Sequence, residues 1–170
     1  MHVLFISGEL IANELVSLLQ LEGHQVKLFI KEIALRDCCQ GFVDVIDDWE
    51  AELAWVGKNG LIIFDDIGFG EKQDALRKQG YRVVGGSALG DRLEIDRAYG
   101  QEIFGKYGIR QIPSFNFTSV REAIKHVRSA PDKQWVVKLN GSQHVSTSNY
   151  VGQLSDGLDV INILKRYQDT

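Results

Sequence analysis

The chain has 170 residues, of which 44% are hydrophobic and 25% are charged. This composition is that of an ordinary soluble domain, and it excludes disordered, collagen-like and disulfide-scaffold proteins. The formal net charge of −4 carries no general signal for nucleic acid or for a membrane surface. The apolar runs are also far shorter than the roughly 20 residues of a membrane-spanning helix. We therefore expect neither a nucleic-acid partner nor a membrane partner.

The first residues lack the basic start and the long apolar core of a signal peptide. The two cysteines, Cys38 and Cys39, are adjacent, so they cannot join distant segments and they lack the spacing of metal ligands. The four histidines show no HxH or HExxH spacing either. These features predict a reduced, cytoplasmic protein with no convincing set of metal ligands in these residues.

Short apolar segments alternate with helical patterns in the first half of the chain. Strands are predicted at residues 3–6, 25–30, 42–46, 61–64 and 81–84, and helices at residues 10–21, 49–56 and 71–78. Such alternation predicts an α/β fold in which helices cover both faces of a parallel sheet.

Ligands of parallel α/β sheets bind at the carboxyl ends of the strands. Ser7 and Gly8, Asp65 and Asp66, and Gly86 follow three of the predicted strands. We expect these residues to lie along one edge and to border a small-molecule site. Each also has a plain structural interpretation, as a strand-to-helix turn, a helix cap or a turn acid. No dinucleotide fingerprint, phosphate loop or nucleophile elbow is present in the sequence.

The regular alternation of short strands with helices ends after residue 90. We predict a long helix at 91–107, an extended connector at 109–113, a strand at 114–117, and a helix capped by Thr118 or Ser119. Strands at 135–139 and 149–154 then enclose a polar loop, and a last helix is capped by Ser155 or Asp156. This second part is small for an independent core.

Two basic residues stand at informative positions. Arg97 lies one turn beyond Glu94 in the predicted long helix, where an exposed charge pair is the ordinary interpretation. Lys138 lies in an apolar strand, which is unfavourable unless its ammonium group reaches water or an anion. Lys138 is therefore either an exposed lysine of an antiparallel sheet or a phosphate ligand beneath the polar loop.

Four short segments resemble motifs of the phosphoribosylamine–glycine ligase family, part of the ATP-grasp superfamily. They are Val-Gly-Gly-Ser (84–87), Arg-Leu-Glu-Ile-Asp-Arg (92–97), Phe-Gly-Lys-Tyr-Gly-Ile (104–109) and Val-Val-Lys-Leu-Asn-Gly (136–141). Their order and spacing match those of the family over residues 75–141. The preceding residues share only its strand-helix pattern.

The resemblance implies a Rossmann-like (pre-ATP-grasp) domain at 1–90, a connecting helix and linker at 91–113, and the first α+β lobe of an ATP-grasp fold at 114–170. ATP would lie between this lobe and a second lobe, which is absent from this chain and is expected to hold Mg²⁺. By the same resemblance, Lys138 and Arg97 occupy phosphate-binding positions, and Gly141 and Ser142 begin the phosphate-covering flap.

The implied function is that of an ATP-dependent carboxylate–amine ligase of purine biosynthesis, which acts through an acyl phosphate. Its small-molecule substrates would be a carboxylate and an amine, and this fragment alone would be inactive. Three segments depart from the family: the turn at 8–12 lacks its Arg and His, 65–70 replaces a substrate segment, and 141–148 replaces the Gly-Lys-Gly flap.

Two other interpretations remain open. A non-catalytic nucleotide or small-molecule binding module with a Rossmann-like fold would account for the altered flap. A receiver-like regulatory domain requires acids after its first strand and an Asp after its third, and Glu9 and Asp47 match this requirement in part.

Overall fold

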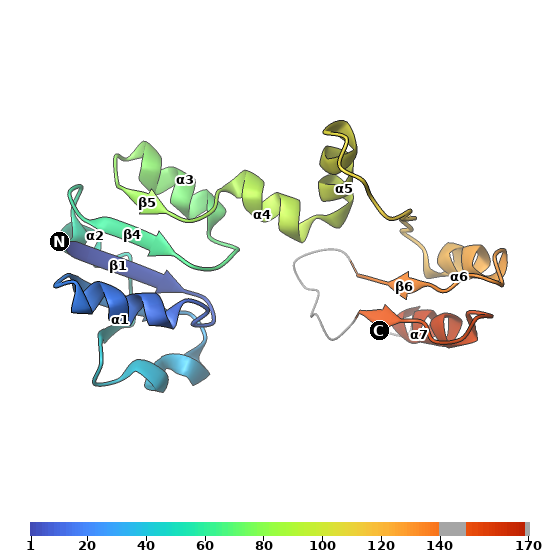
Figure 1. Cartoon of the computed structure of the whole chain (residues 1–170), viewed down its shortest axis with the longest axis horizontal. Helices are drawn as coiled ribbons and strands as arrows, with labels where there is room; N and C mark the ends of the chain where they lie inside the picture. The colour runs from blue at the N-terminus through green and yellow to red at the C-terminus, as the bar shows by residue number, and fades with distance from the viewer. Residues whose placement is uncertain (140–148, 169–170) are drawn as a thin grey trace. The chain divides into compact units, whose positions relative to one another are not determined.

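The computed structural model describes residues 1–139 and 149–168. The chain divides into two compact units, Met1–Arg92 and Leu93–Thr170, and each unit has its own hydrophobic core (Figure 1). Within the described ranges, no helix combines the length and the apolar character needed to cross a membrane.

The first unit is built on a five-stranded parallel sheet in the order β3-β2-β1-β4-β5. The strands are β1 (His2–Ser7), β2 (Gln25–Ile30), β3 (Asp44–Ile46), β4 (Leu61–Phe64) and β5 (Val83–Val84). The predicted α/β class with a parallel sheet is therefore confirmed.

The strand order also decides one of the alternatives. A receiver domain has the order 2-1-3-4-5, whereas the order here is the 3-2-1-4-5 of a Rossmann sheet, in which successive strands are added on one side of β1 and then, from β4 onward, on the other. The receiver-like interpretation is therefore wrong.

Helices cover both faces of this sheet. They are α1 (Asn13–Leu21) and the 3₁₀ helix η1 (Ile33–Cys39) on one face, and α2 (Leu53–Val56) and α3 (Gly70–Lys78) on the other.

The central strand β1 explains this two-sided arrangement. Successive side chains of a strand point to opposite faces, and residues 3–6 are all apolar and fully buried. Val3 packs in the same cluster as Val16 of α1, while Leu4 packs with Leu76 of α3 on the opposite face. A continuous apolar run can thus fill two cores at once.

The second unit contains a short antiparallel sheet covered by two helices. Its elements are α5 (Arg97–Lys106), α6 (Val120–Arg128), β6 (Val136–Val137), β7 (Tyr150–Val151) and α7 (Leu158–Gln168), while α4 (Ala88–Ile95) crosses the division between the units. Apolar side chains of α6 and α7 form its core, against which Trp135, Val137 and Tyr150 pack.

The single long helix predicted at 91–107 is wrong. The chain leaves the helical conformation at Asp96, whose φ of −93° and ψ of 91° are extended, and its carboxylate accepts the N–H of Tyr99 at 3.1 Å. A side chain that caps a new helix competes with continuation of the old one. Glu94 and Arg97 consequently belong to different helices, so they do not stand one turn apart on a single helix as predicted.

The strand predicted at 114–117 is also wrong, because no strand of the described chain pairs with it. Phe115 packs instead on the ring of His126, with ring centroids 4.2 Å apart. The predicted strands at 135–139 and 149–154 are present but pair over two residues each.

The beginnings of the helices differ from the predictions in detail. Helix α1 begins at Asn13 rather than at residue 10, because Leu10 has a φ of +58° in the left-handed region. Ser119 stands at the N-cap of α6, but its side chain accepts no capping hydrogen bond. Asp156 does accept the N–H of Leu158, at 3.0 Å.

Asp159, in the first turn of α7, is the centre of a hydrogen-bond network. Its Oδ2 accepts the N–H of Gln153 at 2.6 Å, the N–H of Leu154 at 3.3 Å and the hydroxyl of Tyr150 at 3.0 Å. The bond from the Gln153 backbone is the main cause that lowers the pKa of Asp159 below its ordinary value of 3.8. The bond to Asp159 is in turn the main cause that raises the pKa of Tyr150 above 10.0.

We predict that Asp159→Asn destabilises the chain at neutral pH and not in strong acid. Because the folded-state pKa is lowered, the stabilisation by Asp159 is present above pH 3.8 and disappears as the pH falls through that lowered value. Urea unfolding of both proteins over a pH series measures this difference, and a difference that persists at the lowest pH would contradict the prediction.

Tyr150→Phe provides the matched alkaline test. The pKa of Tyr150 is raised, so its contribution should be complete below pH 10.0 and disappear as the pH rises through the raised value.

Candidate functional site

The ends of β1 and β4 are joined by the carboxylate of Asp65. Its Oδ2 accepts the hydroxyl of Ser7 at 2.9 Å and the N–H of Ala12 at 3.0 Å. The Ser7 hydroxyl oxygen in turn accepts the N–H of Leu10 at 2.7 Å. These bonds fix the turn that leads from β1 into α1 (Figure 1).

Asp66 lies over the next residue of the same turn. A Cβ placed on Gly8 would overlap the Asp66 carboxylate, so that carboxylate occupies the space where a side chain of residue 8 would stand. A larger residue at position 8 would require the Asp66 side chain to move.

The structure thus brings Ser7, Gly8, Asp65 and Asp66 together, as the strand directions predict. They stand between β1 and β4, where the strand order reverses and where doubly wound sheets bind ligands. Their role in binding a substrate stays a prediction.

Gly86 lies in the turn after β5 and is held from α3. The guanidinium group of Arg77 donates to the carbonyl oxygen of Gly86 at 2.7 Å and to that of Gly85 at 3.3 Å. Asp74, which pairs with Arg77 at 3.2 Å, accepts the N–H of Ala88 at 3.0 Å. The described contacts of Gly86 are with this support and not with Ser7 or Asp65.

Sequence reasoning missed these supporting residues, and it also missed Gln73 and the role of Asp91. Gln73 is fully buried beneath the turn, and Asp91 accepts the N–H of Gly70 at 2.7 Å, at the first residue of α3. The only signal in the sequence was a group of polar residues on a short helix, which is the ordinary pattern of a solvent-exposed face.

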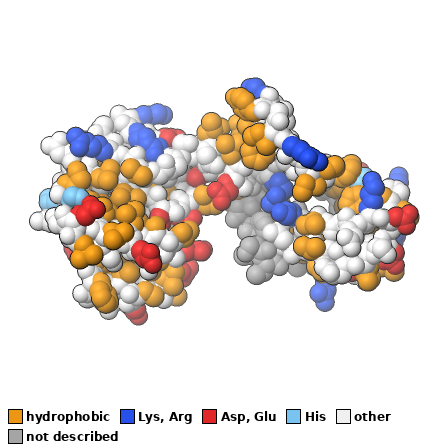
Figure 2. Space-filling view, viewed as in Figure 1, with side chains coloured by type: hydrophobic (Ala, Val, Ile, Leu, Met, Phe, Trp, Pro, Cys, Tyr) orange, Lys and Arg blue, Asp and Glu red, His pale blue; other side chains and the backbone are white. Residues whose placement is uncertain are grey.

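Lys138 follows β6 and is exposed. It stands two residues after Val136, so an extended chain places both side chains on one face of the sheet. Val136 and its partner Val151 are 54% and 57% exposed, whereas Val137 and Tyr150 pack on the helices. This exposed sheet face combines apolar surface with an ammonium group. Figure 2 shows Lys and Arg side chains beside hydrophobic ones on the viewed face of the second unit.

The other predicted phosphate ligands are placed differently. Arg97 is the first residue of α5 and is half-buried. Gly141 and Ser142 lie outside the described residues. The contact of any of these residues with ATP therefore stays a prediction.

The described residues do not fit a magnesium site. Within residues 1–139 and 149–168, no group of three or more His, Cys, Asp or Glu side chains could hold a metal ion. No chemical step of this chain is therefore assigned to a metal.

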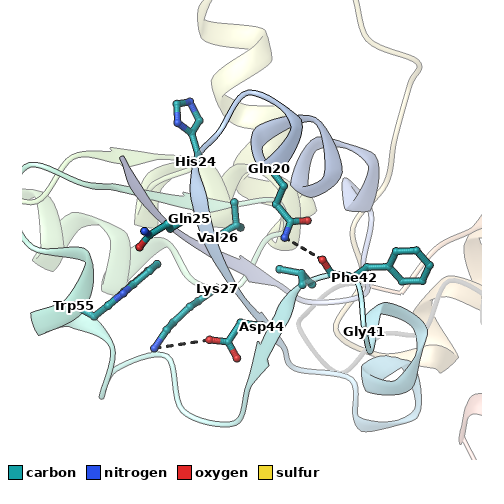
Figure 3. Close-up of a pocket in the computed structure, with 10 residues that line it drawn as sticks. Gln20, His24, Gln25, Val26, Lys27, Gly41, Phe42, Asp44 and Trp55 are labelled. Carbon is teal, nitrogen blue, oxygen red and sulfur yellow. Dashed lines mark hydrogen bonds and ion pairs between the residues drawn. The ribbon is translucent and has the colours of Figure 1, made fainter.

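A separate open cavity of about 480 Å³ lies in the first unit. His24 and Gln25 line this cavity at the beginning of β2. The side chains of Lys27 and Trp55 point toward it (Figure 3). The ammonium group of Lys27 lies 4.0 Å from the carboxylate of Asp44. It therefore lies near the amino ends of the strands, and none of the predicted site residues lines it.

No family model matches the chain, but the chain is similar to a curated protein and to several solved structures. The curated protein is the trifunctional purine biosynthetic protein adenosine-3 of Drosophila pseudoobscura pseudoobscura. It is 29% identical over 99 residues, which cover 55% of this chain and 7% of that protein.

The similar structures include N5-carboxyaminoimidazole synthetase of Staphylococcus aureus, an ATP-grasp enzyme. The crystal structure of its complex with ADP matches this chain with a TM-score of 0.67 and 16% sequence identity. Another crystal structure of the same synthetase matches with a TM-score of 0.64 and 15% sequence identity. Each match covers 96% of this chain and 44% of the synthetase. The resemblance to ATP-grasp enzymes is confirmed. At this level of identity it establishes the fold, and the chain spans less than half of these relatives.

We predict that Asp65→Ala destabilises the first unit by about 1–3 kcal/mol, because Ser7 and the Ala12 N–H lose their common acceptor. Chemical denaturation followed by tryptophan fluorescence measures the change. Asp66→Ala is the matched control, since its one described hydrogen bond is with the neighbouring Ile67 N–H. Equal losses for the two variants would contradict the assigned role of Asp65.

Proposed function

We propose that this chain is the N-terminal part of an ATP-dependent carboxylate–amine ligase of purine biosynthesis, acting through an acyl phosphate. The observation that carries the proposal is the fold match to an ATP-grasp synthetase, which extends over 96% of the chain and so includes both units. The similarity to a purine biosynthetic protein supports the same pathway.

In this proposal, the first unit binds the acceptor substrate at the carboxyl edge of its sheet. Ser7, Gly8, Asp65 and Asp66 border this site, and Gly86 borders it from the turn that Arg77 holds in place. Hydrogen-bonded side chains on rigid strand ends suit this role, because they hold a substrate in a fixed orientation.

ATP lies against the exposed face of β6 and β7, where Val136 and Val151 offer apolar surface to the nucleotide and Lys138 donates to its phosphates. Bound ATP supplies the phosphoryl group that activates the carboxylate. Lys138 and Arg97 balance the negative charge of the phosphates, and Arg97 can also bind one phosphate through two parallel hydrogen bonds.

The remaining parts of the proposal lie outside the described residues. Gly141 and Ser142 begin the flap over the phosphates, and a second lobe beyond this chain supplies the ligands of Mg²⁺. The proposed division is a Rossmann-like domain at 1–90, a connector at 91–113 and the first ATP-grasp lobe at 114–170. We place the protein in the cytoplasm, where its small-molecule substrates would be found.

The alternative is a non-catalytic module that binds a nucleotide or another small molecule. It is favoured by the absence of the family's Gly-Lys-Gly motif from residues 141–148. The two proposals differ in turnover: ADP formation by the natural full-length protein with a panel of amines and carboxylates supports the ligase. Nucleotide binding without ADP formation supports the module.

We predict that Lys138→Ala weakens ATP binding by about ten- to a hundredfold, which corresponds to the loss of one charged hydrogen bond. The affinity is measured by calorimetry on the natural full-length protein. Lys133→Ala is the matched control, because Lys133 is also exposed and precedes the same strand. Unchanged ATP affinity and turnover in Lys138→Ala would remove Lys138 from the site.

A further inference from the structure

Two carboxylates from the end of β4, those of Asp65 and Asp66, lie against the turn from β1 into α1, at the place where doubly wound sheets receive phosphate. Phosphate binds at such turns because the first N–H groups of the following helix are free and the helix dipole favours negative charge. Here the Oδ2 of Asp65 accepts the Ala12 N–H at 3.0 Å, just before α1 begins at Asn13. An internal carboxylate thus takes up a donor that a phosphate would use.

Asp66 occupies the space that a phosphate would need in order to approach the backbone of this turn. A glycine in this turn normally lets a phosphate approach the backbone closely. At Gly8 the corresponding space already holds the carboxylate of Asp66.

The charged groups that contact the turn do not offset these two carboxylates. Lys31 and Glu32 donate their backbone N–H groups to the carbonyl oxygens of Ser7 and Gly8, and their side-chain charges are opposite. Glu9, within the turn itself, adds a further negative charge. A phosphate at Gly8 would therefore meet net negative charge at short range.

We propose that Asp65 and Asp66 determine specificity by excluding phosphate from the β1–α1 turn, so that the acceptor is an amine or carboxylate that places no phosphate there. The assignment to an acceptor rests on the proposed ligase function. The exclusion of phosphate is a property of the turn and can be tested without turnover.

The test uses the chain of 170 residues labelled with ¹⁵N, with ribose 5-phosphate as the probe and ribose as its uncharged control. Backbone amide shifts of residues 8–13 are followed during the titration. We expect no saturable shift in the wild type at millimolar probe. Asp66→Ser should bind ribose 5-phosphate roughly tenfold more tightly than the wild type does, because it removes one repelling charge and also empties the space beside Gly8 that the carboxylate occupies.

Asp132→Asn is the control for net charge, because it removes one exposed carboxylate of the second unit. It should leave the wild-type behaviour unchanged. If Asp66→Ser loses its dispersed amide spectrum, Asp66→Ala removes the same charge and empties the same space.

Two results would overturn the proposal: saturable shifts of residues 8–13 in the wild type with ribose 5-phosphate and not with ribose, or an Asp66 variant that folds but gains no affinity. Both are independent of the ligase assignment. A lack of ADP formation with every acceptor would refute the proposed ligase function and leave the titration result unchanged.

Discussion

The hydrogen bonds of one carboxylate organise the edge on which the candidate site stands. The Oδ2 of Asp65 joins the end of β4 to Ser7 at the end of β1 and to the Ala12 N–H before α1. It accepts hydrogen bonds from two residues more than fifty positions away in sequence. One of them, Ala12, lies outside the strands, so this bond ties the start of α1 to the end of β4 where strand pairing does not. The left-handed Leu10 and the late beginning of α1 fit this connection, because the chain must turn sharply for the Ala12 N–H to reach the carboxylate.

The parallel sheet could be predicted because each of its central strands obeys one simple rule. Strand β1 contains the continuous apolar run 3–6 and every residue of β4 is apolar, and the structure buries both faces of these strands. The break at Asp96 obeys no such rule. Apolar residues recur at helical spacing on both sides of it, and the competition between capping and continuing is settled by the local bond to Tyr99. The strand predicted at 114–117 was wrong for another reason. A strand needs a neighbouring strand to pair with, and a sequence pattern does not reveal whether one is available.

The same contrast holds at the candidate site. Ser7, Gly8, Asp65 and Asp66 were predicted together because strand direction alone brings the ends of parallel strands to one edge. The role of Arg77 was not predicted. Its guanidinium group donates to two carbonyl oxygens of a turn that comes to lie beside it only after folding. The buried Gln73 illustrates the limit further: a glutamine on a short polar helix would normally be exposed, yet the turn after β5 covers it.

The short sheet of the second unit leaves apolar side chains exposed on its outer face. Full burial of a valine side chain contributes about 1.5–3 kcal/mol, and Val136 and Val151 are each more than half exposed on the outer face. A paired strand of two residues contributes little by itself, so the hairpin depends on the packing of its inner face against α6 and α7. In the proposed function, a nucleotide on the outer face would bury the two valines and place its phosphates near Lys138. Binding would then stabilise the sheet that forms the site, since a ligand that binds only the folded state shifts the folding equilibrium toward it.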